Sequence, residues 1–253
     1  MLTVVSSCDK NYYFKSFKRC SIIFWRSVVK KVIFLLFIPL CAWSQNLQLH
    51  YDFGQERHYF TSTLEMFKPD ERGAWFWFVD IDYHSDKKSA SLAYWEIARY
   101  FALPALNNKL SFKIEYNDGF FIGSSEQGGY WGMPFYSAWL AGMGYNFDLG
   151  SVNIQTDVLC RFMPVSDFPD WQLTVVWLKS FSNRFLLAGY FDLWTQDLYG
   201  SKEWIFQAEP QFWYMINAQV GIGGEVEISR ALLFDLYGYD WKAMPTLGLR
   251  YNF

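Results

Sequence analysis

The sequence predicts an all-β protein, a twelve-stranded antiparallel transmembrane β-barrel, and three observations carry this prediction. Segments of about ten residues alternate between apolar and polar side chains and are separated by turn residues, as in membrane barrels. Aromatic residues make up 22% of the 253-residue chain, far more than a soluble core requires. After the N-terminal region, no apolar run approaches the ~20 residues of a membrane helix.

Residues 1–44 are expected to be an export leader, followed by the barrel at 45–253. Basic residues precede the apolar run VIFLLFIPL, and Ala42, Trp43 and Ser44 supply the cleavage positions, with cleavage after Ser44. The alternative is a membrane anchor, for which the run is short. The stretch before Lys30 is long for a leader, and a start codon assigned too far upstream would explain it.

The charge balance disfavours a nucleic-acid partner. The whole chain has a formal net charge of −3, but seven basic residues and one acidic residue fall within 1–45. The rest holds 15 basic and 24 acidic residues, a net charge of −9, whereas a nucleic-acid-binding surface is basic. Only Cys160 lies beyond the leader, so no internal disulfide is expected.

The alternation places twelve strands along the chain. Their expected ranges are 46–53, 57–67, 73–84, 90–102, 109–118, 133–147, 151–163, 170–179, 184–195, 202–214, 219–229 and 243–253. The even-numbered connections are short, and the two longest, 118–132 and 229–243, are odd-numbered. Short periplasmic turns and longer outer loops are typical of bacterial barrels, so this order favours the outer membrane of a Gram-negative bacterium.

Each strand has an apolar and a polar face. In 73–84, Trp75 and Trp77 lie on one face, and Phe78 and Asp80 lie on the other. A soluble β-sandwich or a lipocalin-like barrel would also alternate, but charges in mid-strand have no place in a packed core. Aromatic residues near strand ends on the apolar face, Trp139 among them, suit the girdles at a membrane interface. Phe253 is expected to end the closing strand on its lipid face.

Assigning the polar face to the lumen gives the candidate binding residues. Aromatic rings can stack on a flat base, while carboxylates and amides bind sugar hydroxyls. The inward Lys113, Arg161 and Arg250 are expected to neutralise carboxylates. The candidates are Phe76, Phe78, Asp80, Asp82, Glu96, Lys113, Glu115, Asp157, Arg161, Tyr190, Asp192, Glu209 and Arg250.

The chain resembles the Tsx-like family of nucleoside-specific channel-forming outer-membrane proteins. The resemblance rests on TSTLEMF, AWFWFVDID, SLAYWEIARYF, SAWLAGMGYNFDL and the terminal GLRYNF. It implies a monomeric twelve-stranded barrel whose narrow lumen passes nucleosides. The terminal Phe253 is shared by many outer-membrane proteins, in which it belongs to the signal read by the barrel assembly machinery. Where that family tends to carry two glutamates on its fourth strand, this chain has Glu96 and Ala98.

The expected function is therefore a channel for small solutes, most of all nucleosides, with no cofactor and no metal. Two alternatives remain: a barrel enzyme such as a lipid acyl-hydrolase, or a structural or receptor barrel with a closed lumen. An enzyme needs a nucleophile, a base and an orienting group within reach of one another. The three histidines are His50, His58 and His84, and His84 with its neighbour Ser85 is expected in a solvated loop.

Overall fold

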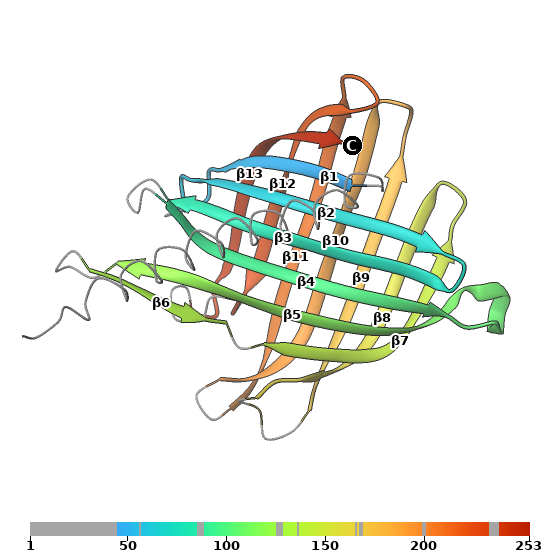
Figure 1. The fold of residues 1–253 in the computed structure, drawn as a ribbon, viewed down its shortest axis with the longest axis horizontal. Helices are drawn as coiled ribbons and strands as arrows, with labels where there is room; N and C mark the ends of the chain where they lie inside the picture. The colour runs from blue at the N-terminus through green and yellow to red at the C-terminus, as the bar shows by residue number, and fades with distance from the viewer. Residues whose placement is uncertain are drawn as a thin grey trace, which may run out of the picture. The chain divides into compact units, whose positions relative to one another are not determined.

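The computed structural model describes residues 45–253 except 56, 85–88, 125–128, 136, 165, 167, 168, 199, 200 and 233–237. The expected leader and Ser85 lie outside the described residues. The chain divides into two compact units, Met1–Trp43 and Ser44–Phe253. The second unit is a single antiparallel sheet closed on itself (Figure 1).

The sheet contains thirteen segments. They are β1 Gln45–Asp52, β2 Phe60–Asp70, β3 Gly73–His84, β4 Ser89–Ala102, β5 Leu110–Ser124, β6 Tyr130–Pro134, β7 Ala138–Asp148, β8 Val152–Phe162, β9 Asp170–Ser180, β10 Phe185–Leu198, β11 Ser201–Met215, β12 Val220–Arg230 and β13 Trp241–Asn252. A short 3-10 helix, η2 Ala105–Asn108, lies between β4 and β5. Because β6 and β7 pair in succession with β5, the thirteen segments build twelve barrel strands.

The first and last strands close the barrel. β1 pairs with β2 on one side and with β13 on the other, from Asn46 opposite Asn252 to Asp52 opposite Thr246. The amide of Phe253 adds a hydrogen bond of 3.0 Å to the carbonyl of Gln45. The predicted twelve-stranded outer-membrane barrel is therefore confirmed.

The two ends of the barrel differ in their connections. One end, called the turn end below, holds the start of β1, the end of β13 and the connections 71–72, 149–151, 181–184 and 216–219. The opposite end, the loop end, holds the longest connection, 231–240, whereas 163–169 at this end and 103–109 at the turn end each have seven residues. The predicted long connection near 229–243 is thus found at this end, but the lengths of the other connections do not separate the two ends.

The predicted loop 118–132 is wrong over most of its length. β5 continues to Ser124, and Phe120–Ser124 pairs with Tyr130–Pro134 of β6. The glycines of this stretch indicated a loop. However, Gly119, Phe121 and Gly123 occupy every second position and therefore share one face of a strand. The predicted strand 133–147 is correspondingly split into β6 and β7.

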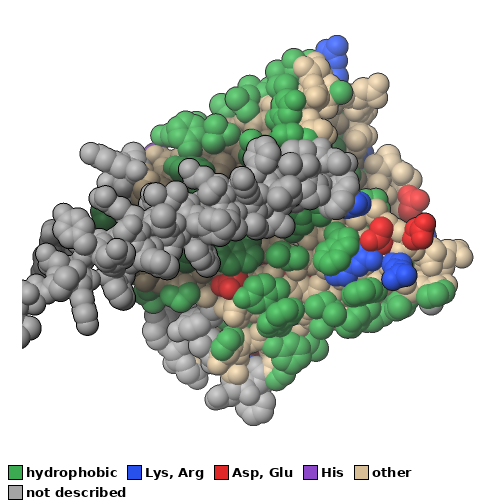
Figure 2. Space-filling view, viewed as in Figure 1, with side chains coloured by type: hydrophobic (Ala, Val, Ile, Leu, Met, Phe, Trp, Pro, Cys, Tyr) green, Lys and Arg blue, Asp and Glu red, His purple; other side chains and the backbone are tan. Residues whose placement is uncertain are grey.

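The outer face of the barrel is apolar and exposed. Leu49, Trp75, Ile97, Ile114, Trp139, Val158, Trp204, Phe212, Ile222 and Leu247 are among its exposed side chains. Figure 2 shows hydrophobic side chains across the visible strands, with charged side chains gathered at the end where β2 meets β3. A soluble monomer rarely exposes so large an apolar surface, so this band faces lipid. Among the described residues, no helix has the length and apolarity to cross a membrane.

Candidate functional site in the barrel interior

All thirteen predicted lumen residues occupy the alternating strand positions that face the interior of the barrel. Strand pairing keeps this parity in register: Asp80 lies opposite Thr63 and Tyr94, and Glu96 lies opposite Phe78 and Asn117. Water reaches the inner wall from the turn end, where the inward-facing Val176 and Leu178 are 39% and 46% exposed. The interior thus combines tightly packed clusters with a wetted surface.

One packed cluster is centred on Lys113 of β5. Its Nζ lies 2.6 Å from Glu115 and 3.0 Å from Asp157 of β8, and these three side chains are at most 4% exposed. Tyr100 of β4 and Gln155 of β8 both donate hydrogen bonds to Asp157, at 2.9 and 2.6 Å. This Lys113 cluster ties three strands together and leaves its charges paired, as burial requires.

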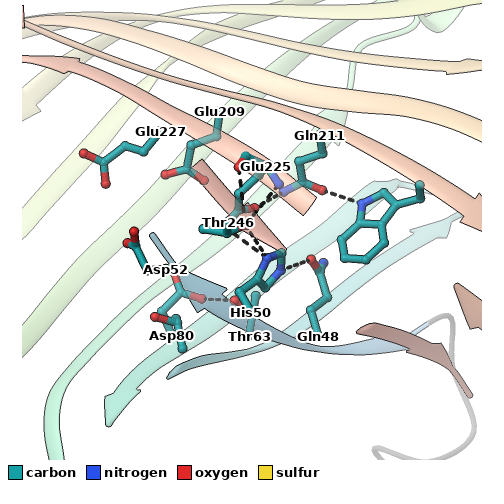
Figure 3. Close-up of polar contacts among 12 residues, drawn as sticks. Gln48, His50, Asp52, Thr63, Asp80, Glu209, Gln211, Glu225, Glu227 and Thr246 are labelled. Carbon is teal, nitrogen blue, oxygen red and sulfur yellow. Dashed lines mark hydrogen bonds and ion pairs between the residues drawn. The ribbon is translucent and has the colours of Figure 1, made fainter. Parts of the chain in front are cut away.

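A second packed cluster, the His50 cluster, contains Gln48, His50, Gln211, Glu225 and Thr246. Nε2 and Nδ1 of the His50 ring each lie 2.9 Å from an oxygen, the first of Gln48 and the second of Thr246. Gln211 donates a 2.8 Å hydrogen bond to Glu225, whose other carboxylate oxygen lies 3.8 Å from His50 (Figure 3). The cluster joins β1 and β13 to β11 and β12 across the closure of the barrel.

Sequence reasoning missed part of this cluster. Gln48 and His50 are almost completely buried, yet neither was a candidate. The alternation of β1, in which Asn46, Gln48, His50 and Asp52 share a face, was the signal that could have identified them.

Arg57 is a further interior cation that the sequence did not indicate. It lies in the connection between β1 and β2 and binds Glu227 through two hydrogen bonds of 3.0 and 3.2 Å, and Asp52 at 3.2 Å. Burial alone would lower the pKa of the Arg57 guanidinium, but these carboxylates hold it above its ordinary value. The predicted strand 57–67 starts only at Phe60 because residues before it form this turn.

Carboxylates from opposite walls face the same space near the middle of the lumen. Asp80 of β3 accepts a hydrogen bond from Thr63, and Glu209 of β11 accepts one from Gln207. Asp80 and Glu209 interact electrostatically, and Figure 3 shows both carboxyl groups directed into the interior. Like charges so placed favour solutes that bring hydrogen-bond donors or positive charge.

Aromatic rings line the wall beside these acids. The centroids of Phe76 and Phe78 on β3 lie 5.9 Å apart, and Phe78 lies 5.9 Å from Tyr94 of β4. The Tyr94 hydroxyl donates to Glu96 at 2.7 Å, and Tyr190 of β10 is hydrogen-bonded to Glu209. Rings and carboxylates therefore alternate on this part of the inner surface.

Asp82, at the loop end of β3, accepts a 2.7 Å hydrogen bond from Thr61. On the far wall, Thr174 donates to Asp192 of β10 at 2.5 Å. Both carboxylates are thus held by a threonine on the neighbouring strand, the arrangement seen at Asp80. The fixed rotamers preorganise a row of acceptors around the lumen.

Among the described residues, Arg161 and Arg250 form no direct ion pair with a carboxylate, although Arg161 interacts electrostatically with Asp192 and Arg250 with Glu65. Arg161 donates a 2.9 Å hydrogen bond to Gln172 and lies 5.5 Å from the Trp194 ring. Arg250 donates to Asn252 at 3.0 Å and lies 5.9 Å from the Trp213 ring. Of the three, Lys113 forms the expected direct ion pairs, and Arg57 forms a further one with Glu227.

The loop end is partly closed by apolar packing. Trp194, Ile205 and Ala231 form a buried cluster, against which Leu232 packs. Ala231 adopts a left-handed backbone with φ of 59°, which turns the chain inward after β12.

The described histidines bear on metal and hydrolase chemistry. Among the described residues, no group of three histidine, cysteine or acidic side chains could hold a metal ion. His50 contacts one hydroxyl, Thr246 Oγ1, which also bonds the backbone of Glu225. The pair faces the lumen, away from lipid. The expectation that His84 lies in a solvated loop is wrong, because His84 is the last residue of β3, is half-buried and packs against the Tyr59 ring.

Comparisons with known proteins agree with this architecture. A family model described as a domain of unknown function, DUF5020, matches residues 44–253. No curated protein matches the sequence. The solved NanC porin aligns with a TM-score of 0.52 and 11% identity, covering 83% of this chain and 100% of that chain.

Two further solved barrels align less closely. The KdgM porin has a TM-score of 0.48 and 9% identity, covering 83% of this chain and 99% of that one. The outer membrane protein Omp33 of Acinetobacter baumannii has a TM-score of 0.43 and 11% identity, covering 83% and 98%. The likeness to NanC supports the barrel fold, and none of these comparisons concerns nucleosides.

Proposed function

The chain belongs to the DUF5020 family, a domain of unknown function, and we propose that it is an outer-membrane channel for small solutes. The observation that carries the proposal is the wetted part of the inner wall. Val176 and Leu178 face inward and are nevertheless substantially exposed. A barrel packed solid with side chains would bury them.

Nucleosides are the proposed preferred solutes. A nucleoside is neutral and combines a flat base with hydroxyl donors. Phe78 and Tyr94 offer ring faces, while Asp80 and Glu209 offer acceptors on facing walls. Single sites of this kind are weak, and weak binding suits passage because a solute must leave as readily as it enters. The monomeric state and an assembly signal at Phe253 belong to the same proposal.

A lipid acyl-hydrolase fits the geometry less well. Its substrate would approach from the bilayer, whereas the imidazole–hydroxyl contact between His50 and Thr246 lies inside the barrel and is partly buried. A receptor barrel with a closed lumen is the other alternative. The Lys113 and His50 clusters would suit it, but the exposure of inward Leu178 would not.

Conductance in a planar bilayer tests the proposal. The purified barrel should give single-channel steps in potassium chloride, and adenosine should interrupt the current more strongly than glycine or glucose at equal concentration. Steps without any preference among the three solutes would keep the channel and remove the nucleoside assignment. Absence of conductance from a heat-modifiable, folded barrel would favour the closed receptor.

A further inference from the structure

Six aromatic side chains form an unbroken row on the inner side of β3–β6. Successive ring centroids lie between 5.4 and 6.1 Å apart. In order from the interior to the loop end, the aromatic row consists of Phe76, Phe78, Tyr94, Phe135, Phe121 and Trp131. Only the first two were sequence-predicted lumen residues.

The outer half of the row depends on two glycines of β5. Gly119 and Gly123 share the inward face with Phe121. A Cβ at Gly119 would collide with the Phe135 ring, and a Cβ at Gly123 would collide with the Trp131 ring. Each ring therefore lies directly over a glycine, in space that any larger residue would fill.

The row becomes more accessible toward the loop end. Trp131 is 45% exposed, whereas Phe121, Phe135 and Tyr94 are half-buried. β6 pairs only with β5 among the described strands, so Trp131 lies at an edge of the sheet.

Anchoring in lipid does not account for the row. The opposite face of the same hairpin carries Phe120 and Tyr130, which are exposed, and Phe120 contacts the outward-facing Trp95. That face can serve the membrane interface. Phe121 instead pairs across the strands with Met133 and points to the side of Gly119 and Tyr94.

We propose that the aromatic row is a track that captures planar heteroaromatic solutes at Trp131 and passes them inward to Phe76. The inference rests on the proposed channel function and adds its entry site and its direction. Each ring offers one weak stacking position, and neighbouring rings lie close enough for a base to engage the next before leaving the last. Hydrogen-bond acceptors, Asp80 and Glu96, accompany the inner half of the track.

Adjacent residues on opposite faces supply matched variants. Trp131→Ala and Phe121→Ala remove rings from the track, and Tyr130→Ala and Phe120→Ala remove rings from the other face of the same hairpin. Adenosine is added to the loop-end side of a bilayer, and its association rate is measured from current fluctuations. Each track variant should lower this rate about tenfold, since one stack is worth about that factor. Each control should change it less than twofold.

Further arms separate the track from other effects. Trp131→Phe should retain most of the adenosine association rate. Any effect of ribose alone on the current should be the same in every variant. Potassium chloride conductance should stay unchanged, as evidence of a folded pore. Equal rates in parent, Trp131→Ala and Phe121→Ala would overturn the track, as would equal losses in the controls. If adenosine never blocks the parent although the barrel conducts potassium chloride, the nucleoside assignment fails, and the track fails with it.

Discussion

The hydrogen-bonded clusters and the aromatic row arise from the same strand alternation but are held in opposite ways. In the Lys113 and His50 clusters, each polar atom is fixed by partners on neighbouring strands, and little surface remains exposed. In the aromatic row, rings contact rings and glycines, and ring surface is exposed at Trp131. The clusters therefore hold the barrel together, while the row is free to bind.

The largest effect should come from the Lys113 cluster. Lys113→Met would leave Glu115 and Asp157 buried without their cation, which should cost about 3–5 kcal/mol of stability. The heat-modifiable gel shift of the variant should occur at a markedly lower temperature. Lys179→Met is the control, because Lys179 lies over Phe181 outside the cluster. If Lys113→Met and Lys179→Met had the same melting temperature, the Lys113 cluster would not hold the barrel together, and its contrast with the aromatic row would fail.

Arg57 should matter next. Arg57→Gln removes hydrogen bonds to Glu227 and Asp52, and hydrogen bonds to charged groups are worth about 1.5–3 kcal/mol. It also deletes a positive charge from an acidic interior, so the reversal potential in a potassium chloride gradient should shift toward potassium. A shift toward chloride would show that Arg57 does not face the ion path.

The row should show its effect in affinity rather than in stability. Phe78→Ala should weaken adenosine binding by ~1–3 kcal/mol, the worth of one base stack, with little change in melting. Trp77→Ala, on the lipid face of the same strand, should lower the melting temperature and leave affinity alone. The reverse pattern in titrations and melting curves would mean that β3 is assigned inside out.

The smallest expected effect concerns a single neutral contact in the His50 cluster. Gln48→Ala deletes the bonds from Gln48 to His50 and to Asn46, and should cost about 0.5–1.5 kcal/mol in melting experiments. Adenosine affinity should not change, because the cluster is packed away from the row. Lost affinity at unchanged stability would place Gln48 in the binding surface instead.

The sequence predicted the barrel well because one rule governs most of it. Alternation fixes which face meets lipid, and a slip of one residue would turn every side chain over. The range of β3, Gly73–His84, and the inward parity of Glu209 followed from this rule alone. The hairpin of β5 and β6 was missed because its glycines serve ring packing, not a turn.

Partners within the interior could not be predicted in the same way. Lys113 and Asp157 are 44 positions apart, and their contact depends on the register between β5, β7 and β8. Arg57 enters the lumen from a turn, where alternation carries no information. The local sequence pattern thus identified which side chains face inward. Which of them contact one another across different strands depends on the closed fold.

Cysteine protection at position 209 tests most directly whether solutes pass through the lumen between the walls that carry Asp80 and Glu209. Glu209→Cys is placed in a Cys160→Ser background, since Cys160 is the free, exposed cysteine of the described chain. A charged, water-soluble thiosulfonate should react with the new thiol and reduce conductance, and adenosine should slow that reaction. A thiol that reacts without changing the current, or at the same rate with adenosine present, would contradict the account.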